Sequence, residues 1–185
     1  MFKEDVAEKI IETSEHFSGL FEVAKNARWS DAERSAELEK LMKEAGWQLG
    51  WPYCMSFVEA VWVKTYRDLK APNDLLNFVR KSLNPSVINS YSTFKSHWLI
   101  KKHPSPGSIM FLQKSFGGTG HAGIVESWTA GDPTFKTIEG NTNPAPGSAE
   151  ADREGDGIFR KSRKLDYLTS EKKLNLLGFL EPIEW

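Results

Sequence analysis

The order of helical and strand patterns along the chain predicts an α+β fold. Apolar residues recur at three- and four-residue spacing in the first 70 residues, and short runs rich in β-branched residues follow from residue 107 onward. Consecutive short strands that follow the helices are typical of an antiparallel sheet. We therefore expect N-terminal helices packed on a central antiparallel β-sheet.

The composition fits an ordinary globular protein and excludes several other classes. Of the 185 residues, 39% are hydrophobic and 26% are charged, which does not suit a disordered chain. The 24 basic and 25 acidic residues leave a net charge of −1, so no general field favours nucleic acid or an anionic membrane. No apolar run reaches 18 residues, so we expect no membrane insertion.

Two helices are predicted before residue 47. Residues 3–16 place Val6, Ile10 and Phe17 on one face. The stretch from Ser30 to Glu33 matches a capping box, in which Ser30 would begin the second helix. That helix carries an apolar stripe, and a glycine at position 46 is a natural C-terminal stop.

A longer helical pattern begins directly after the sequence Trp-Pro-Tyr at 51–53. Its members recur at three- and four-residue spacing: Cys54, Val58, Val61, Trp62, Thr65 and Leu69. Beyond it, we expect a short helix over 75–81 and then loop to residue 102.

The second half of the chain has the pattern of a sheet. Strands are predicted over 108–113, 121–127, 135–141, 158–164 and 177–183. A glycine-rich turn over 114–120 joins the first two strands, and residues 143–157 are expected to form an exposed loop. The fourth strand carries a basic run, Arg160, Lys161, Arg163 and Lys164, interpreted as a solvated strand edge, with contact to an anionic polymer as the alternative.

Glycines 118, 120 and 123 match the glycine patterns of dinucleotide-binding and kinase loops, but their context excludes both. A dinucleotide fingerprint must open a helix, whereas the β-branched pair Ile124-Val125 continues a strand. A kinase needs further signature segments that the chain lacks. These glycines are instead interpreted as shaping a hairpin and leaving space around His121.

Cys54 is the candidate nucleophile. One cysteine cannot form an internal disulfide, and a thiolate zinc site is not expected. A lone cysteine is usually a buried small hydrophobe. Cys54, however, lies in the first turn of a predicted helix, where free N–H groups and the partial positive charge stabilise a thiolate. We therefore expect an exposed and reactive thiolate.

The candidate general base is His121, which begins a predicted strand between two glycines. The other histidines are weaker candidates, because His16 lies on an amphipathic helix and His97 and His103 lie in a poorly patterned stretch. A third group must hold the imidazole in the right tautomer.

Two residues of the third predicted strand could orient the imidazole. Period-two alternation places Glu139 and Asn141 on one face and Ile138 on the other. Which of the two polar residues braces the ring stays open, and ordinary polar residues at a strand end are the alternative interpretation.

Four sequence words occur in an order that resembles the CHAP family, the cysteine, histidine-dependent amidohydrolases/peptidases. They are WPYCMSFVEAVW at 51–62, PGSIMF at 106–111, GHAGIV at 120–125 and EGNT at 139–142. The Pro-aromatic-Cys start resembles in particular the phage- and prophage-encoded branch. The resemblance covers about residues 45–142.

This resemblance implies a papain-like fold and hydrolysis of peptidoglycan amide bonds without a cofactor. It matches Cys54 to the family nucleophile, His121 to the general base, and Glu139 and Asn141 to the residues that orient the histidine. It also makes Gln48 a candidate oxyanion donor. Some members bind calcium through aspartates near the nucleophile, but residues 44–55 contain none, so we expect no metal site.

Two of the seven tryptophans are candidates for contact with sugar rings of the substrate. Trp51 and Trp98 could line a binding groove, with core packing as the alternative interpretation. We expect a single domain with a helical part over 1–46 and a catalytic core over 47–185, acting as a monomer on bacterial peptidoglycan.

The resemblance favours an N-acetylmuramoyl-L-alanine amidase or a peptidoglycan endopeptidase, used as a phage or prophage lysin. The alternatives are a catalytically inactive wall-binding or virion module, a secreted antibacterial amidase effector, and a cysteine hydrolase of other substrates. The N-terminus lacks the apolar core of a secretory signal. We therefore expect synthesis in the host cytoplasm and delivery to the wall by other factors.

Overall fold

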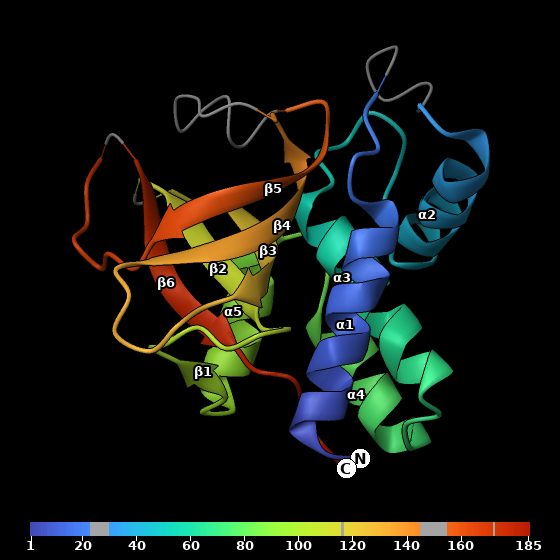
Figure 1. Cartoon of the computed structure of the whole chain (residues 1–185), viewed down its shortest axis with the longest axis horizontal. Coiled ribbons are helices and arrows are strands. Elements are labelled where there is room, and N and C mark those ends of the chain that lie inside the picture. The colour runs from blue at the N-terminus through green and yellow to red at the C-terminus, as the bar shows by residue number, and fades with distance from the viewer. Residues whose placement is uncertain (23–29, 116, 145–154, 172) are drawn as a thin grey trace.

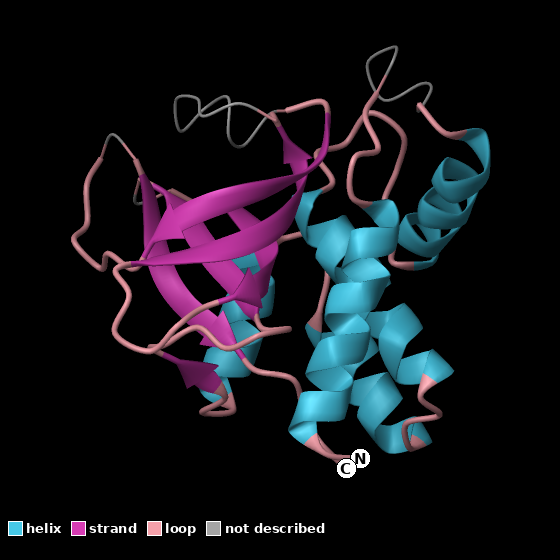
Figure 2. Cartoon of the chain, in the orientation of Figure 1, coloured by secondary structure: helices cyan, strands magenta, loops and turns pink. Residues whose placement is uncertain are grey.

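The computed structural model describes residues 1–22, 30–115, 117–144, 155–171 and 173–185. Within these ranges, five helices precede six strands. The first four helices lie together on one side of the molecule, and the fifth lies against the sheet on the other (Figures 1 and 2). The helices are α1 (Lys3–Phe17), α2 (Ala32–Glu44), α3 (Cys54–Asp68), α4 (Asn73–Ser82) and α5 (Val87–Ser96). The strands are β1 (Ile100–Lys101), β2 (Ile109–Lys114), β3 (Gly120–Ser127), β4 (Thr134–Thr142), β5 (Gly157–Lys164) and β6 (Leu174–Leu180). The predicted α+β class is confirmed.

The six strands form one curved sheet in the order β1-β6-β2-β3-β4-β5, and all the pairs are antiparallel. Because side chains alternate along a strand, the sheet has two buried faces. One face joins the helices in the main core through Ile109, Phe111, Ala122, Ile124 and Ile138. The other face has its own apolar cluster, which includes Met110, Leu112, Val125, Phe135 and Phe179.

Helix α3 is the centre of the molecule. Twelve of its 15 residues are buried, and α1, α2 and α4 all pack on it, as do β3 and β4 (Figure 1). The sequence predicts an apolar stripe for this helix, but every residue from Cys54 to Val63 is buried, whichever way it faces. A helix segment that is buried all round lies inside a core. The position of α3 therefore fixes where Cys54, its first residue, lies in the molecule.

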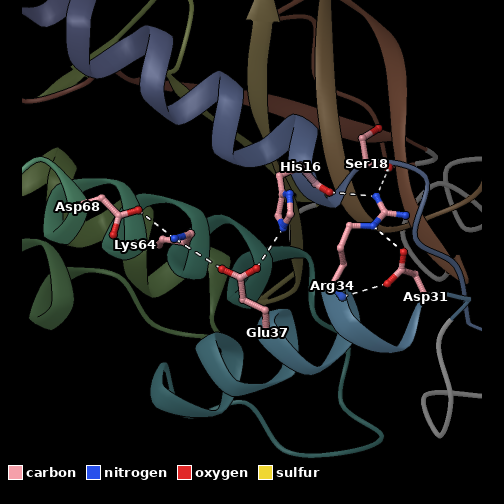
Figure 3. Close-up of polar contacts among 7 residues, drawn as sticks. All are labelled: His16, Ser18, Asp31, Arg34, Glu37, Lys64 and Asp68. Atoms are coloured by element: carbon pink, nitrogen blue, oxygen red, sulfur yellow. Dashed lines mark hydrogen bonds and ion pairs between the residues drawn. The ribbon is translucent and has the colours of Figure 1, made fainter.

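Polar contacts join α1 and α2 to α3 at the surface (Figure 3). The carboxylate of Glu37 on α2 lies between His16 of α1, at 3.0 Å, and Lys64 of α3, at 3.5 Å. The guanidinium of Arg34 also donates to the His16 carbonyl oxygen at 3.0 Å. These side chains are partly exposed, so each pair stabilises the arrangement only modestly.

The start of α2 differs by one residue from the prediction. Asp31, not Ser30, is the N-cap, and its carboxylate accepts a hydrogen bond from the Arg34 N–H at 3.0 Å. The Ser30 hydroxyl instead accepts from the Phe21 N–H, which ties it to the preceding segment. The predicted stop is confirmed, because Gly46 adopts φ +87° and its N–H donates to the Lys43 carbonyl oxygen.

Three further elements were incompletely predicted. Residues 87–96, expected to be loop, form α5, which packs against β1, β2 and β3. The last strand covers 174–180 rather than 177–183, because it is held in register by β2. Of the expected loop over 143–157, residues 145–154 lie outside the described residues, and Gly155 and Gly157 are buried rather than exposed.

The two ends of the described chain lie together (Figure 1). The amino group of Met1 donates to the Trp185 carbonyl oxygen, and Lys3 pairs with Glu181 at 2.9 Å. Among the described helices, none combines the length and apolar character needed to cross a bilayer.

Candidate active site

Cys54 is the first residue of α3, directly after the N-cap Tyr53. The first backbone N–H groups of a helix have no carbonyl partner within it, so the turn that carries the thiol offers hydrogen-bond donors. The residue is 5% exposed and belongs to the packed core together with Tyr53 and Met55. The prediction of an exposed thiol is therefore wrong: the burial of α3 on all sides includes its first turn.

The loop before Cys54 is held by defined hydrogen bonds. The Trp51 N–H donates to the Gln48 carbonyl oxygen across a turn in which Gly50 adopts φ +89°, a conformation that favours glycine. The indole N–H of Trp47 donates to the Trp51 carbonyl oxygen at 2.8 Å. These hydrogen bonds hold the turn that leads into α3.

His121 lies on β3 with its side chain fully buried. Its Nε2 is 2.7 Å from Oε2 of Glu139. Its Nδ1 has no hydrogen-bond partner among the described residues. The Cys54 thiol is nevertheless close enough to raise the pKa of the ring. Burial by itself lowers the pKa of His121, but the thiol and the Glu139 carboxylate outweigh it and raise the pKa to about 9.

Glu139 lies on β4, is also fully buried, and accepts hydrogen bonds from three side chains. Besides His121, the Thr137 hydroxyl donates at 2.5 Å and the Arg163 guanidinium donates to both carboxylate oxygens. Burial alone raises the pKa of the carboxyl, but Arg163 and His121 hold it well below its usual range. Because an ionised carboxylate can only accept, Nε2 of His121 carries a proton and Nδ1 is the nitrogen left for the thiol.

Arg163 and Thr137 are members of this cluster that the sequence does not predict for the site. Arg163 belongs to the basic run on β5, for which the sequence predicts a solvated strand edge. Its side chain is 14% exposed and turned toward Glu139. The alternation of β5, in which every second residue faces inward, is the signal that separates it from its neighbours.

Gly123 makes room for the carboxylate. A Cβ at this position would lie 2.5 Å from Cγ of Glu139 and 3.3 Å from the Ile138 carbonyl oxygen. The sequence interpretation that the glycines leave space around His121 is thus too general: Gly123 leaves space for Glu139, the partner of that histidine.

Asn141 departs from the regular alternation predicted for β4, and its role at the ring stays a prediction. It adopts φ +55°, and the pairing of β4 with β5 shifts register between Glu139 and Thr142. Asparagine tolerates this left-handed conformation better than most residues. Its backbone meets the Tyr53 phenol, and its carbonyl oxygen accepts from the Gly155 N–H at 3.0 Å.

The remaining predicted site residues lie at the surface. Gln48 is exposed in the turn before Cys54, and Trp51, in the same turn, is 45% exposed. Trp98 is 90% exposed after the end of α5, and no contact among the described residues joins it to Cys54. The roles predicted for these three residues stay predictions.

The other three histidines lie outside this cluster. His16 pairs with Glu37, the ring of His97 packs edge-on against Phe78, and the ring of His103 stacks on Trp128. Across the described part of the chain, no group of three or more His, Cys, Asp or Glu side chains could hold a metal ion.

A thiol at a helix N-terminus, an imidazole beside it and a carboxylate behind the imidazole can together perform nucleophilic acyl transfer. No curated protein and no solved structure matches the chain significantly. The family model of the CHAP domain, however, matches residues 44–141, a range that contains Cys54, His121 and Glu139. The chain therefore belongs to the CHAP family, whose domains are typically cysteine- and histidine-dependent amidohydrolases and point to peptidoglycan as the substrate.

Proposed function

We propose that this protein cleaves an amide bond of peptidoglycan, with Cys54 as the nucleophile and His121 as the general base and acid. The observation that carries the proposal is the state of the His121 ring. Its Nε2 is bonded to a buried, ionised Glu139, while its Nδ1 remains available to the thiol at the start of α3. This is the arrangement that activates a cysteine for attack on a carbonyl.

In the proposed mechanism, Nδ1 of His121 takes the proton of Cys54, and the thiolate attacks the scissile carbonyl carbon. His121 then donates that proton to the leaving amine, which leaves a thioester on Cys54. His121 next takes a proton from water, which attacks the thioester and releases the carboxylate product and the free thiol. Glu139 stabilises the imidazolium in both halves of the reaction.

The developing oxyanion needs hydrogen-bond donors close to Cys54. The backbone N–H groups in the first turn of α3 are available for this role, because they have no partner within the helix. The side chain of Gln48 is a second candidate donor, and Trp51 in the same turn would contact a sugar ring of the substrate. Both residues precede the nucleophile closely in the sequence, and both are exposed, so a ligand can reach them.

The bond is proposed to be either the muramoyl–L-alanine amide or a peptide bond in the stem or cross-bridge. Digestion of purified peptidoglycan followed by mass spectrometry of the soluble fragments distinguishes them. An amidase leaves intact peptides and peptide-free glycans, whereas an endopeptidase leaves shortened peptides on the glycan.

The central experiment compares clearing of a peptidoglycan suspension by the wild type, Cys54→Ala and Cys54→Ser. We expect both variants to lose clearing by at least about a hundredfold while they keep their circular dichroism spectrum, because general base and nucleophile act as a unit. Equal clearing by variants and wild type would refute the thiol mechanism. Because residues 44–55 contain no aspartate, excess EDTA is expected to leave the wild-type rate unchanged.

We further propose that the enzyme serves as a lysin of phage or prophage origin that reaches the wall through other factors. The Pro-aromatic-Cys start at 52–54 supports this assignment. Lysis of intact bacteria only when a membrane-permeabilising partner is co-expressed would agree with it. Wall binding with no bond cleavage in any digest would instead assign the inactive wall-binding module.

A further inference from the structure

The basic run on β5 is divided between two surroundings. Arg160 faces outward, with 50% of its side chain exposed, and pairs with Glu126 and Glu15. Arg163 faces inward, with 14% exposed, and reaches the buried Glu139. Arg160 can therefore serve as the surface control for Arg163, which lies beside the candidate active site on the same strand.

The guanidinium of Arg163 donates hydrogen bonds to both oxygens of the Glu139 carboxylate. Its Nε donates to Oε1 at 2.7 Å, and its Nη2 donates to Oε2. The same Oε2 accepts from Nε2 of His121, and Oε1 accepts from the Thr137 hydroxyl. Four donors on three strands thus determine where the carboxylate lies.

A carboxylate with no exposed surface needs a cation to remain ionised. Burial of an unpaired charge is unfavourable enough that the group takes up a proton instead. His121 cannot supply the cation throughout the reaction, because it loses and regains its proton in each cycle. An arginine stays protonated at every working pH, and its planar fork fits both carboxylate oxygens, which a lysine cannot match.

We propose that Arg163 is a positioning residue for the thiol chemistry: it keeps Glu139 ionised and oriented, so that Glu139 holds His121 with Nδ1 toward Cys54. The proposal deepens the proposed function and rests on it where the cleavage of peptidoglycan is concerned. The reactivity of the Cys54 thiol can be measured without any substrate.

The proposal predicts a loss that depends on pH. Without the guanidinium, the buried carboxyl takes up a proton at mildly acidic pH and no longer stabilises the imidazolium. Less thiolate then forms at that pH. At alkaline pH the carboxyl is ionised again, so the difference shrinks.

The test measures the rate at which iodoacetamide alkylates Cys54, followed by intact-protein mass spectrometry between pH 5 and 9. The chain has one cysteine, so each added group reports this thiol alone. We expect Cys54 to be alkylated at least about tenfold more slowly in Arg163→Met than in the wild type at pH 6, and at a similar rate at pH 9. Arg163→Lys is expected to fall between them, and Arg160→Met to match the wild type.

A structural role of Arg163 would not produce this pattern. Addition of methylguanidinium to Arg163→Ala is expected to restore part of the rate at pH 6, because it replaces the missing group. If Arg163→Met fails to fold, Arg163→Lys and the rescued Arg163→Ala carry the test. A folded Arg163 variant with the wild-type pH profile would overturn the proposal, as would an equal effect of Arg160→Met.

Turnover separates this proposal from the proposed function. A wild type that alkylates rapidly at pH 6, and an Arg163→Met variant that does not, support the positioning role even if peptidoglycan is not cleaved. Cys54-dependent clearing that is unchanged in Arg163→Met across the pH range would leave the proposed function intact and overturn the positioning role alone.

Discussion

At the residue scale, the site depends on a carboxylate that solvent does not reach. Glu139 is fully buried, and every contact that defines its position comes from a side chain of β3, β4 or β5. A buried charge of this kind is strongly stabilised by its partners and strongly destabilising when a partner is removed. Small changes beside Glu139 should therefore have large effects on the chemistry of His121 and Cys54.

Gly123→Ala tests this sensitivity without removing any functional group. The new Cβ would lie 2.5 Å from Cγ of Glu139, so the side chain of Glu139 or the backbone beside it must shift. We expect the rate of peptidoglycan clearing to fall at least about tenfold, because a displacement near 1 Å can reduce catalysis a hundredfold. Gly118→Ala is the matched control, since a Cβ there meets nothing within 4 Å. An unaffected Gly123→Ala enzyme would show that the position of Glu139 is unimportant.

The protonation of His121 makes a second prediction at this scale. Because its pKa is raised from 6.5 to about 9, its charge stabilises the fold fully below pH 6.5, and this stabilisation disappears as the pH rises through about 9. Activity that requires the imidazolium should decline over the same alkaline range. In Cys54→Ala the ring loses one of its stabilising partners, so the NMR titration midpoint of His121 should move to lower pH. An unchanged midpoint would show that thiol and imidazole do not interact.

At the scale of elements, the helices are defined by their ends as much as by their apolar faces. The carboxylate of Asp31 begins α2, and Gly46 ends it in a left-handed conformation. Helix α2 in turn packs on α3, the helix that begins with Cys54. The cap of α2 therefore stabilises a neighbour of the helix that carries the nucleophile.

Asp31→Ala is expected to lower the free energy of unfolding by about 1 kcal/mol, the usual effect of losing an N-cap. Urea denaturation followed by circular dichroism would measure it. Ser30→Ala should have a smaller effect, because its hydroxyl accepts one exposed hydrogen bond, from the Phe21 N–H. If Ser30→Ala were the more damaging change, the helix would begin where the capping-box pattern predicted.

At the scale of the whole molecule, the end of the described chain is attached to the central helix. The phenol of Tyr66, near the C-terminal end of α3, donates to the Ile183 carbonyl oxygen at 3.0 Å and accepts from the Ile183 N–H at 2.6 Å. The ring of Trp185 packs against Tyr66, with 5.5 Å between centroids. Residues 183–185 therefore support the same helix that carries the nucleophile at its other end.

Tyr66→Phe should separate stability from activity. Removal of the hydroxyl leaves both backbone groups of Ile183 without this partner, which is expected to lower the free energy of unfolding by about 1–3 kcal/mol. Tyr66 lies twelve residues along α3 from Cys54, about 18 Å at 1.5 Å per residue, so the clearing rate of folded protein should not change. Paired thermal and clearing assays would measure both, and a matching loss of activity would indicate coupling along α3.

The interpretation of single residues shows where local pattern suffices. Cys54 was placed at the start of a helix because the spacing of apolar residues after it is a local property of the sequence. Residues 87–96, expected to be loop, form a helix in which only Val87, Ser90 and Phe94 are buried, and packing against β1, β2 and β3 stabilises it. Local signals thus predict elements with strong periodicity and miss those that depend on tertiary contacts.

The sequence by itself determined the α+β class, the helix that begins at Cys54, and the strands that carry His121 and Glu139, because periodicity and turn residues act over a few positions. Only the tertiary structure decided that Cys54 is buried, that Glu139 bonds His121, and that Arg163 completes the cluster. The last two facts depend on the register of the sheet, which places β3, β4 and β5 side by side. Register arises from pairing between distant segments, so no local pattern contains it.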